Sequence, residues 1–307
     1  MKRAKGIIMI IAGAMLWGAT GPMMEWILDT SKMSVSFMLI IRLLLAGLVL
    51  LLVLKIKGVP ITRPLRHKVW LRQLCIFGVI GMLGVQYTFV GSIHTSNAVI
   101  ATLFQFLAPI YIIIFVSLRQ KAFPPAAQII GMAVTMGGLI LLLTNGKLSG
   151  FALTTEALFF GLAVGFTFAF YTLYPVRLMN EWGVLLSVGW GMLIGGCTLL
   201  IVNILNFGKG IGALTNMNVS LMLLLVIIVG TAAFLLFLGS MKYISPVETS
   251  ILSSFEPLTA MLISVLWFGS VLGHWQMVGG AIMLLGVTGL SVAGSKKKEI
   301  ERIPPES

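Results

Sequence analysis

The most constraining feature of this chain is a long stretch without charge. From Gln73 to Leu118 there are 46 consecutive residues without a Lys, Arg, Asp or Glu. A single helix of that length would measure about 69 Å, whereas about 20 apolar residues suffice to cross the hydrocarbon core of a bilayer. The stretch must therefore fold back on itself. The turn-forming residues of GSIHTSN, 91–97, mark the expected reversal.

Composition places the chain in a lipid bilayer. Of its 307 residues, 58% are hydrophobic and 10% are charged, with a mean hydropathy of +1.05, whereas soluble domains carry roughly 25% charged residues. Too little polar surface remains to cover a water-soluble globule, so we expect a multi-pass protein of the cell membrane. Cys75 and Cys197 fall inside apolar runs, which predicts buried, unpaired thiols and no disulfide or metal site.

The same treatment of the other apolar runs predicts ten membrane-spanning helices in an all-α fold. The first follows a basic start and lacks a small-residue cleavage site, so we expect it to stay in the protein as a span. The predicted spans are 6–28, 34–54, 69–90, 97–118, 124–143, 155–174, 184–206, 219–240, 246–268 and 273–293.

The distribution of basic residues sets the expected topology. With the N-terminus inside, 17 of the 21 Lys and Arg residues fall in inner segments, as the positive-inside rule requires. The outer segments hold Lys32, Lys147 and Lys209, and Arg42 lies within a span. We therefore expect both termini in the cytoplasm. The net charge of +12 is assigned to contact with anionic lipid, and no nucleic-acid partner is expected.

An internal repeat appears when the sequence is shifted by 148 residues. The offset aligns prolines, glutamines and glycines without a gap: Gly91-Ser92 with Gly239-Ser240, Pro109 with Pro257, Gln128 with Gln276, Gly131 with Gly279, and Gly138 with Gly286. Each half has five predicted spans, so the two copies must cross the membrane in opposite senses. We expect two inverted five-helix repeats, 1–147 and 148–295, followed by a basic cytoplasmic tail, 296–307. Inverted repeats are typical of secondary transporters, whose substrate site lies near the midplane between the halves.

Several segments resemble the EamA family of the drug/metabolite transporter superfamily. The similarity covers nearly the whole chain and is carried by these stretches: AMLWGAT, IIRLLLAGLVLL, QYTFVGSIHTSNAVIATLFQFLAPIYIII, FLLFLGSMKYISPVETSILSSFEPLTAML, and the Gln276, Gly279 and Gly286 pattern. The resemblance implies ten helices, cytoplasmic termini, a central cavity lined by spans one to four and six to nine, and export of small metabolites.

The chain departs from that family in one duplicated motif. Members often carry Gly-Glu at the ends of spans four and nine. Here Gly269-Ser270 occupies the second position, and Arg119-Gln120-Lys121 lies near the first. If that glutamate helps gating in relatives, its role is absent or moved in this chain.

Two glutamates in the ninth predicted span call for different interpretations. Glu248 follows Ser245 and Pro246 at the spacing of a capping box at a helix start. Glu256 lies about 15 Å farther along the helix than Pro246, half the depth of the hydrocarbon. Pro257 removes a backbone donor there and is expected to leave one carbonyl, that of Ser253, without its partner.

A charge at that depth is costly, by at least about 2.5–3.5 kcal/mol, and binding a proton avoids part of the cost. Glu256 is therefore the candidate residue for proton coupling. The alternative is a structural carboxyl, held neutral or paired with Arg42. Arg42 is itself either an anchor for a substrate carboxylate or the partner of Glu256, and the pairing is the favoured interpretation.

Polar and aromatic residues of spans one, two, three, four, six and nine form the predicted binding site. They combine hydrogen-bonding groups with aromatic walls, which suits an amino acid or a similar amphiphile. A break of the first helix at Gly21-Pro22 is also expected to help form the site. The candidate substrate-binding or cavity residues are Trp17, Thr20, Arg42, Gln86, Tyr87, Gln105, Tyr171, Tyr174 and Ser253.

These features predict a secondary active transporter that exports an amino acid or similar small metabolite by alternating access through a central cavity. A broad-specificity drug exporter is the alternative within transport, and a channel or non-transporting membrane scaffold is the alternative in a different class. No catalytic cluster, phosphate-binding loop or metal-spaced histidine is apparent, so we expect no enzyme activity, cofactor or metal. The expected partners are the small-molecule substrate, the bilayer and, as a candidate coupling ion, the proton.

Overall fold

The computed structural model describes residues 2–96, 98–147, 154–268 and 273–286, and every regular element in these ranges is helical. The predicted all-α class is therefore confirmed. The elements in chain order are α1 (Lys2–Ser31), α2 (Val35–Ile56), η1 (Arg63–Arg66), α3 (Lys68–Ile76), η2 (Phe77–Leu83), α4 (Gly84–Thr95), α5 (Ala98–Gln105), α6 (Ala108–Gln120), α7 (Ala126–Thr144), α8 (Thr155–Leu173), α9 (Val176–Trp182), α10 (Val184–Val202), α11 (Ile204–Phe207), η3 (Gly208–Thr215), α12 (Met217–Ser240), α13 (Pro246–Leu252) and α14 (Phe255–Phe268). Residues 274–286 are also helical.

Eight helical segments are long and apolar enough to cross a bilayer, and they coincide with the first eight predicted spans. The third of these segments runs unbroken from α3 through the π-helical η2 into α4. The ninth predicted span is divided into α13 and α14, and the tenth is described over 273–286, of which 274–286 is helical. The predicted boundary between the repeats, the Gly269-Ser270 pair and the tail 296–307 lie outside the described residues.

Helix starts follow from local capping chemistry. The side chains of Ser34, Thr154 and Asn216 accept backbone N–H groups in the first turns of α2, α8 and α12, which satisfies donors that the helix itself cannot. At the start of α13, Ser245 and Glu248 form both hydrogen bonds of a capping box. The structural role predicted for Glu248 is thus confirmed.

Two helix breaks lie at positions related by the 148-residue offset. One separates α5 from α6 near Pro109, and the other separates α13 from α14 near Pro257. A proline in the first turn of the second helix cannot donate to the preceding turn. The Ser253 carbonyl nevertheless has a partner, because it accepts the Glu256 N–H at 2.9 Å. The expectation that this carbonyl lacks a donor is therefore wrong, since the chain closes with a tighter turn.

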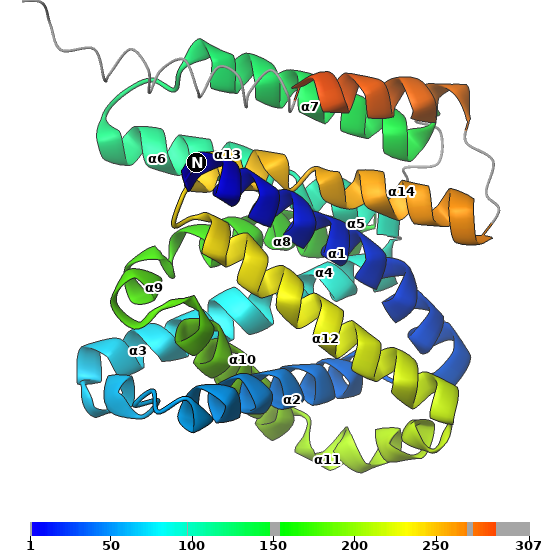
Figure 1. Ribbon diagram of the computed structural model, residues 1–307. Coiled ribbons are helices and arrows are strands. Elements are labelled where there is room, and N and C mark those ends of the chain that lie inside the picture. Colours follow the sequence, from blue (N-terminus) through cyan, green and yellow to red (C-terminus); the bar gives the residue numbers. More distant parts are fainter. Residues whose placement is uncertain (1, 97, 148–153, 269–272, 287–307) are drawn as a thin grey trace, which may run out of the picture.

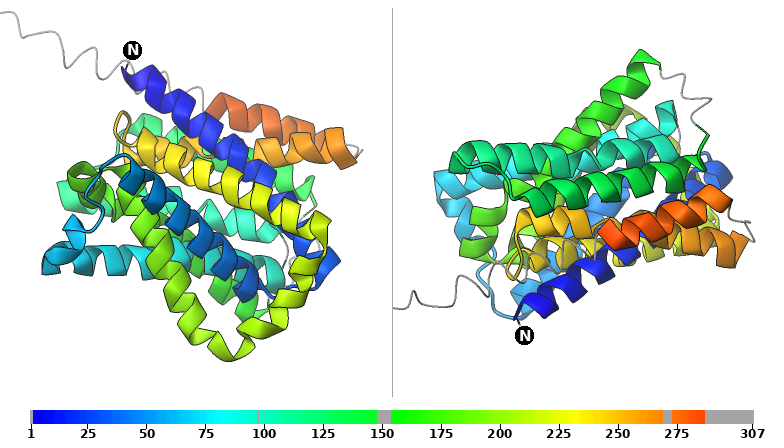
Figure 2. Two further views of the ribbon diagram at one scale, coloured as in Figure 1. Left: turned by 60° about the horizontal axis from the view of Figure 1, so that its bottom comes forward. Right: turned by 90° about the horizontal axis from the view of Figure 1, so that it is seen from above.

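The helices pack in a pattern that is preserved when the two halves are exchanged. Helix α1 of the first half packs on α12 and α14, while α8, its counterpart in the second half, packs on α4, α5 and α6. Helix α2 packs on its own counterpart α10. Figures 1 and 2 show α7 and the helix at 274–286 lying side by side on one flank of the bundle. This exchange symmetry is the pattern that two inverted repeats would produce.

The contact between α7 and the helix at 274–286 depends on glycine. A Cβ atom on Gly138 would lie 2.5 Å from the amide nitrogen of Met283 and 2.7 Å from the carbonyl oxygen of Gly279. Such distances leave no room for a side chain, so the two backbones approach as closely as small residues permit. Gly138 and Gly279 both belong to glycine pairs of the internal repeat.

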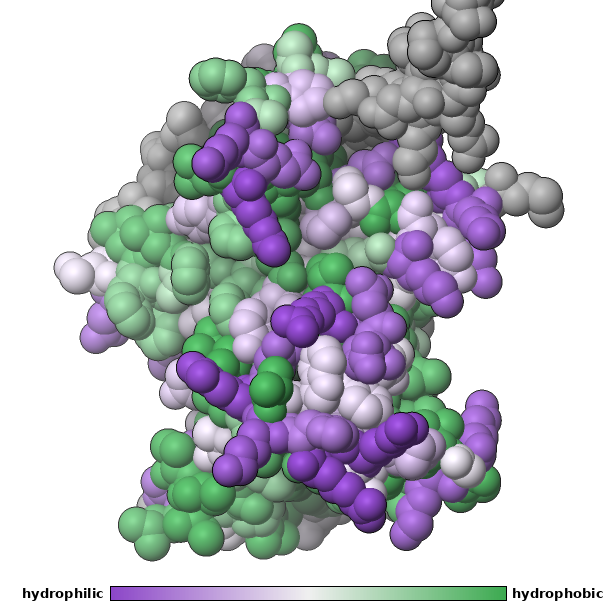
Figure 3. Space-filling model, turned by 90° about the vertical axis from the view of Figure 1, so that its left-hand side faces the viewer, coloured by the Kyte–Doolittle hydropathy of each residue, from purple (hydrophilic) through white to green (hydrophobic). Residues whose placement is uncertain are grey.

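The surface combines an apolar circumference with a polar end. Large apolar side chains are exposed around the bundle, among them Ile56 and Leu266, as expected where lipid replaces water. Cys75 and Cys197 are also exposed, so the prediction that they are buried is wrong. The end at which α1, α3 and α13 begin is called the basic end, and Figure 3 shows the hydrophilic side chains gathered there. Its exposed cationic residues are Lys2, Lys5, Lys55, Lys57, Arg63, Arg66, Lys68, Arg72, Arg119, Lys121, Arg177 and Lys242.

Candidate functional site

A cavity of about 490 Å³ lies between the two halves of the helical bundle. Its walls come from α1, α2, α4, α5 and α7 of the first half, and from α8, α12, α14 and the helix at 274–286 of the second. The lining includes Leu28, Ile93 and Leu143, which lie near the ends of their helices opposite the basic end. The cavity therefore extends from the middle of the bundle toward that opposite end.

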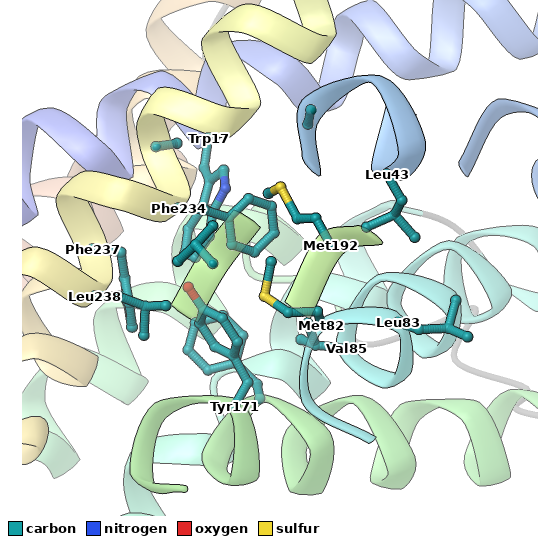
Figure 4. Packing of buried hydrophobic residues seen from close by; sticks show 14 of the residues in the cluster. Trp17, Leu43, Met82, Leu83, Val85, Tyr171, Met192, Phe234, Phe237 and Leu238 are labelled. Carbon is teal, nitrogen blue, oxygen red and sulfur yellow. The ribbon is translucent and has the colours of Figure 1, made fainter. Parts of the chain in front are cut away.

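Aromatic rings bound the cavity on the side of the basic end. The ring of Trp17 packs against Phe234 at 4.9 Å between centroids, Phe168 at 5.9 Å and Tyr171 at 6.4 Å. Phe237 packs 5.0 Å from Trp17 and lies outside the cavity lining. Figure 4 shows Trp17, Phe234 and Tyr171 turned toward one another from α1, α12 and α8. We call these five residues the aromatic floor.

Two polar residues from opposite halves meet at the cavity wall. The Nε2 group of Gln105, at the end of α5, donates to Oε2 of Glu256, in the first turn of α14, at 3.1 Å. Each residue lies beside one of the two repeat-related helix breaks. The breaks thus bring an amide and a carboxyl group together at the junction of the halves, where both side chains line the cavity.

Arg42 is not paired with Glu256 in this structure. The ion pair found among the described residues joins Arg3 to Glu248, and the favoured prediction of an Arg42–Glu256 pair is therefore wrong for this conformation. The Arg42 guanidinium donates from Nη1 to the Met24 sulfur at 3.3 Å and lies 5.7 Å from the Phe234 ring centroid. It lines the cavity and is 5% exposed.

Seven of the ten predicted site residues line this cavity. They are Trp17, Thr20, Arg42, Gln86, Gln105, Tyr171 and Glu256. Because they come from both halves of the chain, the fold brings together groups that are up to 239 residues apart in the sequence.

Three other predicted residues lie outside the cavity lining. Tyr87 is 41% exposed on the outer side of α4. Tyr174 stacks on Phe170, with 4.6 Å between the ring centroids, and Ser253 is buried with its hydroxyl donating to the Ser250 carbonyl at 2.7 Å. The expected break of the first helix is also absent, because α1 continues through Pro22.

The sequence prediction missed several lining residues. Phe168 and Phe234 form part of the aromatic floor, and Thr102, Phe89 and Met261 line the remaining wall. Phe168 precedes Tyr171 by three residues and so shares its helix face, which is a signal that the sequence contained. Helix α12 is strongly apolar and has almost no amphipathic pattern, so its sequence gave little indication that Phe234 faces a cavity.

Contacts between α1 and the second half close the bundle at the basic end. Arg3 donates to Glu248 with Nη2 and Oε1 2.8 Å apart, and the Lys5 ammonium lies 5.3 Å from the Tyr243 ring centroid. Gly6 is buried in the same region, and a Cβ there would lie 2.8 Å from that of Tyr243. The cavity is thus separated from the basic end by the aromatic floor and by this closely packed helix start.

Within the described ranges, no group of three or more His, Cys, Asp or Glu side chains is arranged to hold a metal ion. The arrangement can instead enclose a small molecule between apolar rings and a few polar side chains. The polar lining residues are Thr20, Arg42, Gln86, Thr102, Gln105, Tyr171, Glu256 and Gln276.

Known proteins resemble this chain along its whole length. YicL of Salmonella typhimurium, described as an uncharacterized inner membrane transporter, is 33% identical over 295 residues, covering 95% of this chain and 97% of the relative. YwfM of Bacillus subtilis, described as an uncharacterized transporter, is 25% identical and covers 96% of both chains. A solved crystal structure has the same fold, with a TM-score of 0.75, 17% sequence identity and coverage of 95% of this chain and 98% of that one.

The EamA-like transporter family matches residues 4–144 and again residues 155–292. The two matches together cover the helices of both halves, including those that line the cavity. The chain is therefore a multi-pass membrane transporter that belongs to the EamA-like transporter family.

Proposed function

We propose that this protein is a secondary transporter that exports an amino acid or similar small metabolite by alternating access. In this proposal, residues 1–147 and 148–295 form two inverted repeats, both termini lie in the cytoplasm, and the cavity between the repeats is the substrate site. The basic end faces the cytoplasm, in keeping with its lysines and arginines. The described conformation is then the outward-facing one.

The observation that carries the proposal is the cavity itself. It lies at the junction of the two halves, extends toward one end of the bundle and is separated from the other end by the aromatic floor. An open pore would lack such a floor. If the halves are inverted repeats, each can adopt the conformation of the other, which would close the present mouth and open the basic end.

Within this cycle, Glu256 is the proposed proton carrier. Its carboxyl lines the cavity, is hydrogen-bonded to a neutral amide, and has no cationic side chain within 4.0 Å among the residues that the structure describes. A carboxyl in this position can exchange a proton with whichever side the cavity faces. Substrate and proton would then share one site, which is a simple way to couple their movements.

Counterflow in proteoliposomes tests the transport proposal. Untargeted metabolite comparison of cells with and without the protein selects the substrate, and the purified protein is then reconstituted. Unlabelled substrate inside the vesicles should accelerate entry of labelled substrate, because a carrier that has bound substrate turns its site back to the outer face faster than an empty one does. Flux that is independent of the internal substrate would indicate a channel, and the absence of flux for every selected metabolite would favour a scaffold.

A broad drug exporter would bind unrelated lipophilic cations. The buried Arg42 guanidinium in the cavity wall opposes binding of a second positive charge nearby. We therefore expect lipophilic cations to compete weakly with the transported metabolite. Strong competition by several unrelated cations would replace the metabolite proposal with the drug-export proposal.

A further inference from the structure

We propose that Arg42 binds the carboxylate of the transported molecule, and that the preferred substrate is an α-amino acid with an apolar side chain. The inference rests on the proposed transport function and deepens it by assigning each part of the substrate to a part of the cavity. It is carried by three buried polar groups in the cavity wall whose hydrogen-bonding capacity the described protein does not fill.

Arg42 is the first of these groups. A guanidinium carries five N–H donors in a planar fork, and a thioether sulfur is a weak acceptor. Among the described residues, the Met24 sulfur at 3.3 Å is the hydrogen-bond acceptor found for Arg42, and no carboxylate lies within 4.0 Å of it. A charge that is 5% exposed and has no counter-ion is unfavourable. An anion that enters the cavity would supply the missing partner.

The backbone of α12 passes close to this guanidinium. A Cβ atom on Gly230 would be 2.5 Å from Nη2 of Arg42, so the planar group occupies space that only a glycine leaves free. On the same helix, the Phe234 ring packs against the guanidinium. These two contacts with α12 limit the space open to the guanidinium, and its planar fork can offer two parallel N–H groups to a carboxylate.

The second group is the side-chain amide of Gln86. Its Nε2 donates to the Met82 carbonyl at 3.0 Å, whereas its Oε1 is buried and has no hydrogen-bond partner within the described part of the chain. An unpaired carbonyl oxygen calls for an N–H donor. The ammonium group of an amino acid supplies such donors, and the Glu256 carboxyl, which also lines the cavity, provides it with an acceptor of opposite charge.

The third group is the Tyr171 hydroxyl. It is fully buried within the aromatic floor, and no hydrogen-bond partner is found for it in the ranges that the structure describes. Tyr171 lines the cavity, and its hydroxyl is enclosed by the floor, so a polar group of a bound molecule reaches it when the neighbouring rings move aside. The rings of Trp17, Phe168 and Phe234 beside it form an apolar surface suited to the side chain of the substrate.

Together the three groups favour a zwitterion over a simple carboxylic acid or amine. The carboxylate would meet Arg42, the ammonium would meet Gln86 and Glu256, and the apolar side chain would lie on the aromatic floor. A cavity of about 490 Å³ is large enough for such a molecule with room to spare.

Matched ligand series test the assignment directly. L-leucine and L-phenylalanine are compared with their methyl esters and with the deaminated acids 4-methylpentanoate and 3-phenylpropionate. Binding to the purified full-length protein is measured by ligand-induced thermal stabilisation. The free amino acids should bind about tenfold to hundredfold more tightly than the esters, because charge-assisted hydrogen bonds to Arg42 are lost in the esters. The deaminated acids should bind more weakly than the amino acids and more tightly than the esters.

Variants locate the preference for the free acid. Arg42→Gln should bind acid and ester equally, whereas Arg42→Lys should keep part of the preference because it keeps the charge. Gly230→Ala retains the arginine but moves its guanidinium away from the added methyl group, and it should therefore reduce the preference. Arg119→Gln, at an exposed position at the end of α6, is the control and should bind as the natural protein does.

The assignment is overturned if no free acid of either series binds, if the esters bind as tightly as the acids, or if Arg42→Gln keeps the preference. These results are separable from failure of the transport proposal. Counterflow of a solute without a carboxylate, unaffected by Arg42→Gln, would leave a carrier and remove the Arg42 assignment. Carboxylate-dependent binding without counterflow would keep the Arg42 assignment and remove the transport proposal.

Discussion

Gln105 and Glu256 are 151 residues apart in the sequence and share a hydrogen bond of 3.1 Å in the wall of the central cavity. Each lies next to a helix break, and the two breaks are related by the internal repeat. A proline follows each break within the first turn of the next helix. The duplicated prolines thus have a structural consequence. Each lies at a helix break that places a polar side chain in the cavity wall, where a continuous apolar helix would present none.

Replacing Glu256 by Gln tests proton coupling. The substitution keeps the size of the side chain and a hydrogen-bonding partner for Gln105, and it removes the exchangeable carboxyl proton. We expect substrate flux into proteoliposomes to lose its dependence on an imposed pH gradient, while counterflow continues at a higher substrate concentration, because the variant also lacks the charge that the substrate ammonium would contact. Glu156→Gln, at an exposed site in the first turn of α8, should behave as the natural protein does. A pH dependence that is unchanged in Glu256→Gln would remove its coupling role.

Replacing Gln105 by Leu tests the contact between the halves. The variant leaves a carboxyl group in the cavity wall without its amide donor, and such a loss typically destabilises a protein by about 1–3 kcal/mol. We expect a lower apparent melting temperature of the purified protein and a lower rate of flux. The control is Gln120→Leu, at the exposed end of α6. Equal melting temperatures for the two variants would contradict the assigned role of Gln105.

Gly18 allows α1 to pack closely against α14. A Cβ atom on Gly18 would collide with the Glu256 carbonyl oxygen and would lie 2.9 Å from Cβ of Thr259. Gly18→Ala should therefore displace the start of α14 and destabilise the protein by about 1–3 kcal/mol, as overpacking commonly does. Gly21→Ala is the matched control, because no atom lies within 4 Å of its added methyl group. Thermal unfolding and flux of the two variants should differ clearly, and similar behaviour would show that the contact is dispensable.

The Arg3–Glu248 ion pair joins the start of α1 to the start of α13. Both side chains are partly exposed, so the pair is expected to contribute at most about 1 kcal/mol to stability. That amount is still enough to shift an equilibrium between two conformations several-fold. Arg3→Gln is preferred over a change of Glu248, because Glu248 also caps α13. We expect Arg3→Gln to open the basic end more often.

Thiol labelling measures this shift. A cysteine replaces Ser240, which is fully buried and shares a hydrogen bond with Thr249 between α12 and α13, in a protein with Cys75 and Cys197 changed to Ser. Its reaction with an impermeant reagent applied at the basic end should be several-fold faster with Arg3→Gln, whereas Lys2→Gln should have no effect. Equal rates in all three proteins would show that the ion pair does not hold this end closed.

Hydropathy and proline positions predicted much of this fold, because both act locally. Eight apolar runs became helices at the expected places, and the capping box at Ser245 formed as its spacing predicts. Which side chains of each helix point into the cavity was harder to predict. Gln86 points into the cavity and its neighbour Tyr87 points away, since adjacent residues differ by about 100° around a helix. The preceding π-helical segment η2 changes the register of that face in a way that apolar residues do not reveal.

The partners of buried charges could not be predicted from spacing. Arg42 and Glu256 were expected to neutralise each other, yet each lines the cavity without contacting the other. Their separation depends on how α2, α12 and α14 pack, and in particular on the room that Gly230 leaves for the guanidinium. Such packing is a property of the assembled bundle and has no local signature in the sequence.

If the cavity opens alternately to the two membrane faces, a residue in its wall must be reachable from both. A single cysteine at Gly21, a lining position with open space around it, is placed in the protein that lacks Cys75 and Cys197 and reconstituted in one orientation. Alternating access predicts labelling by impermeant thiol reagents applied to either face, slowed by the transported substrate in both cases. Labelling from one face alone, even during sustained substrate flux, would contradict alternating access through this cavity.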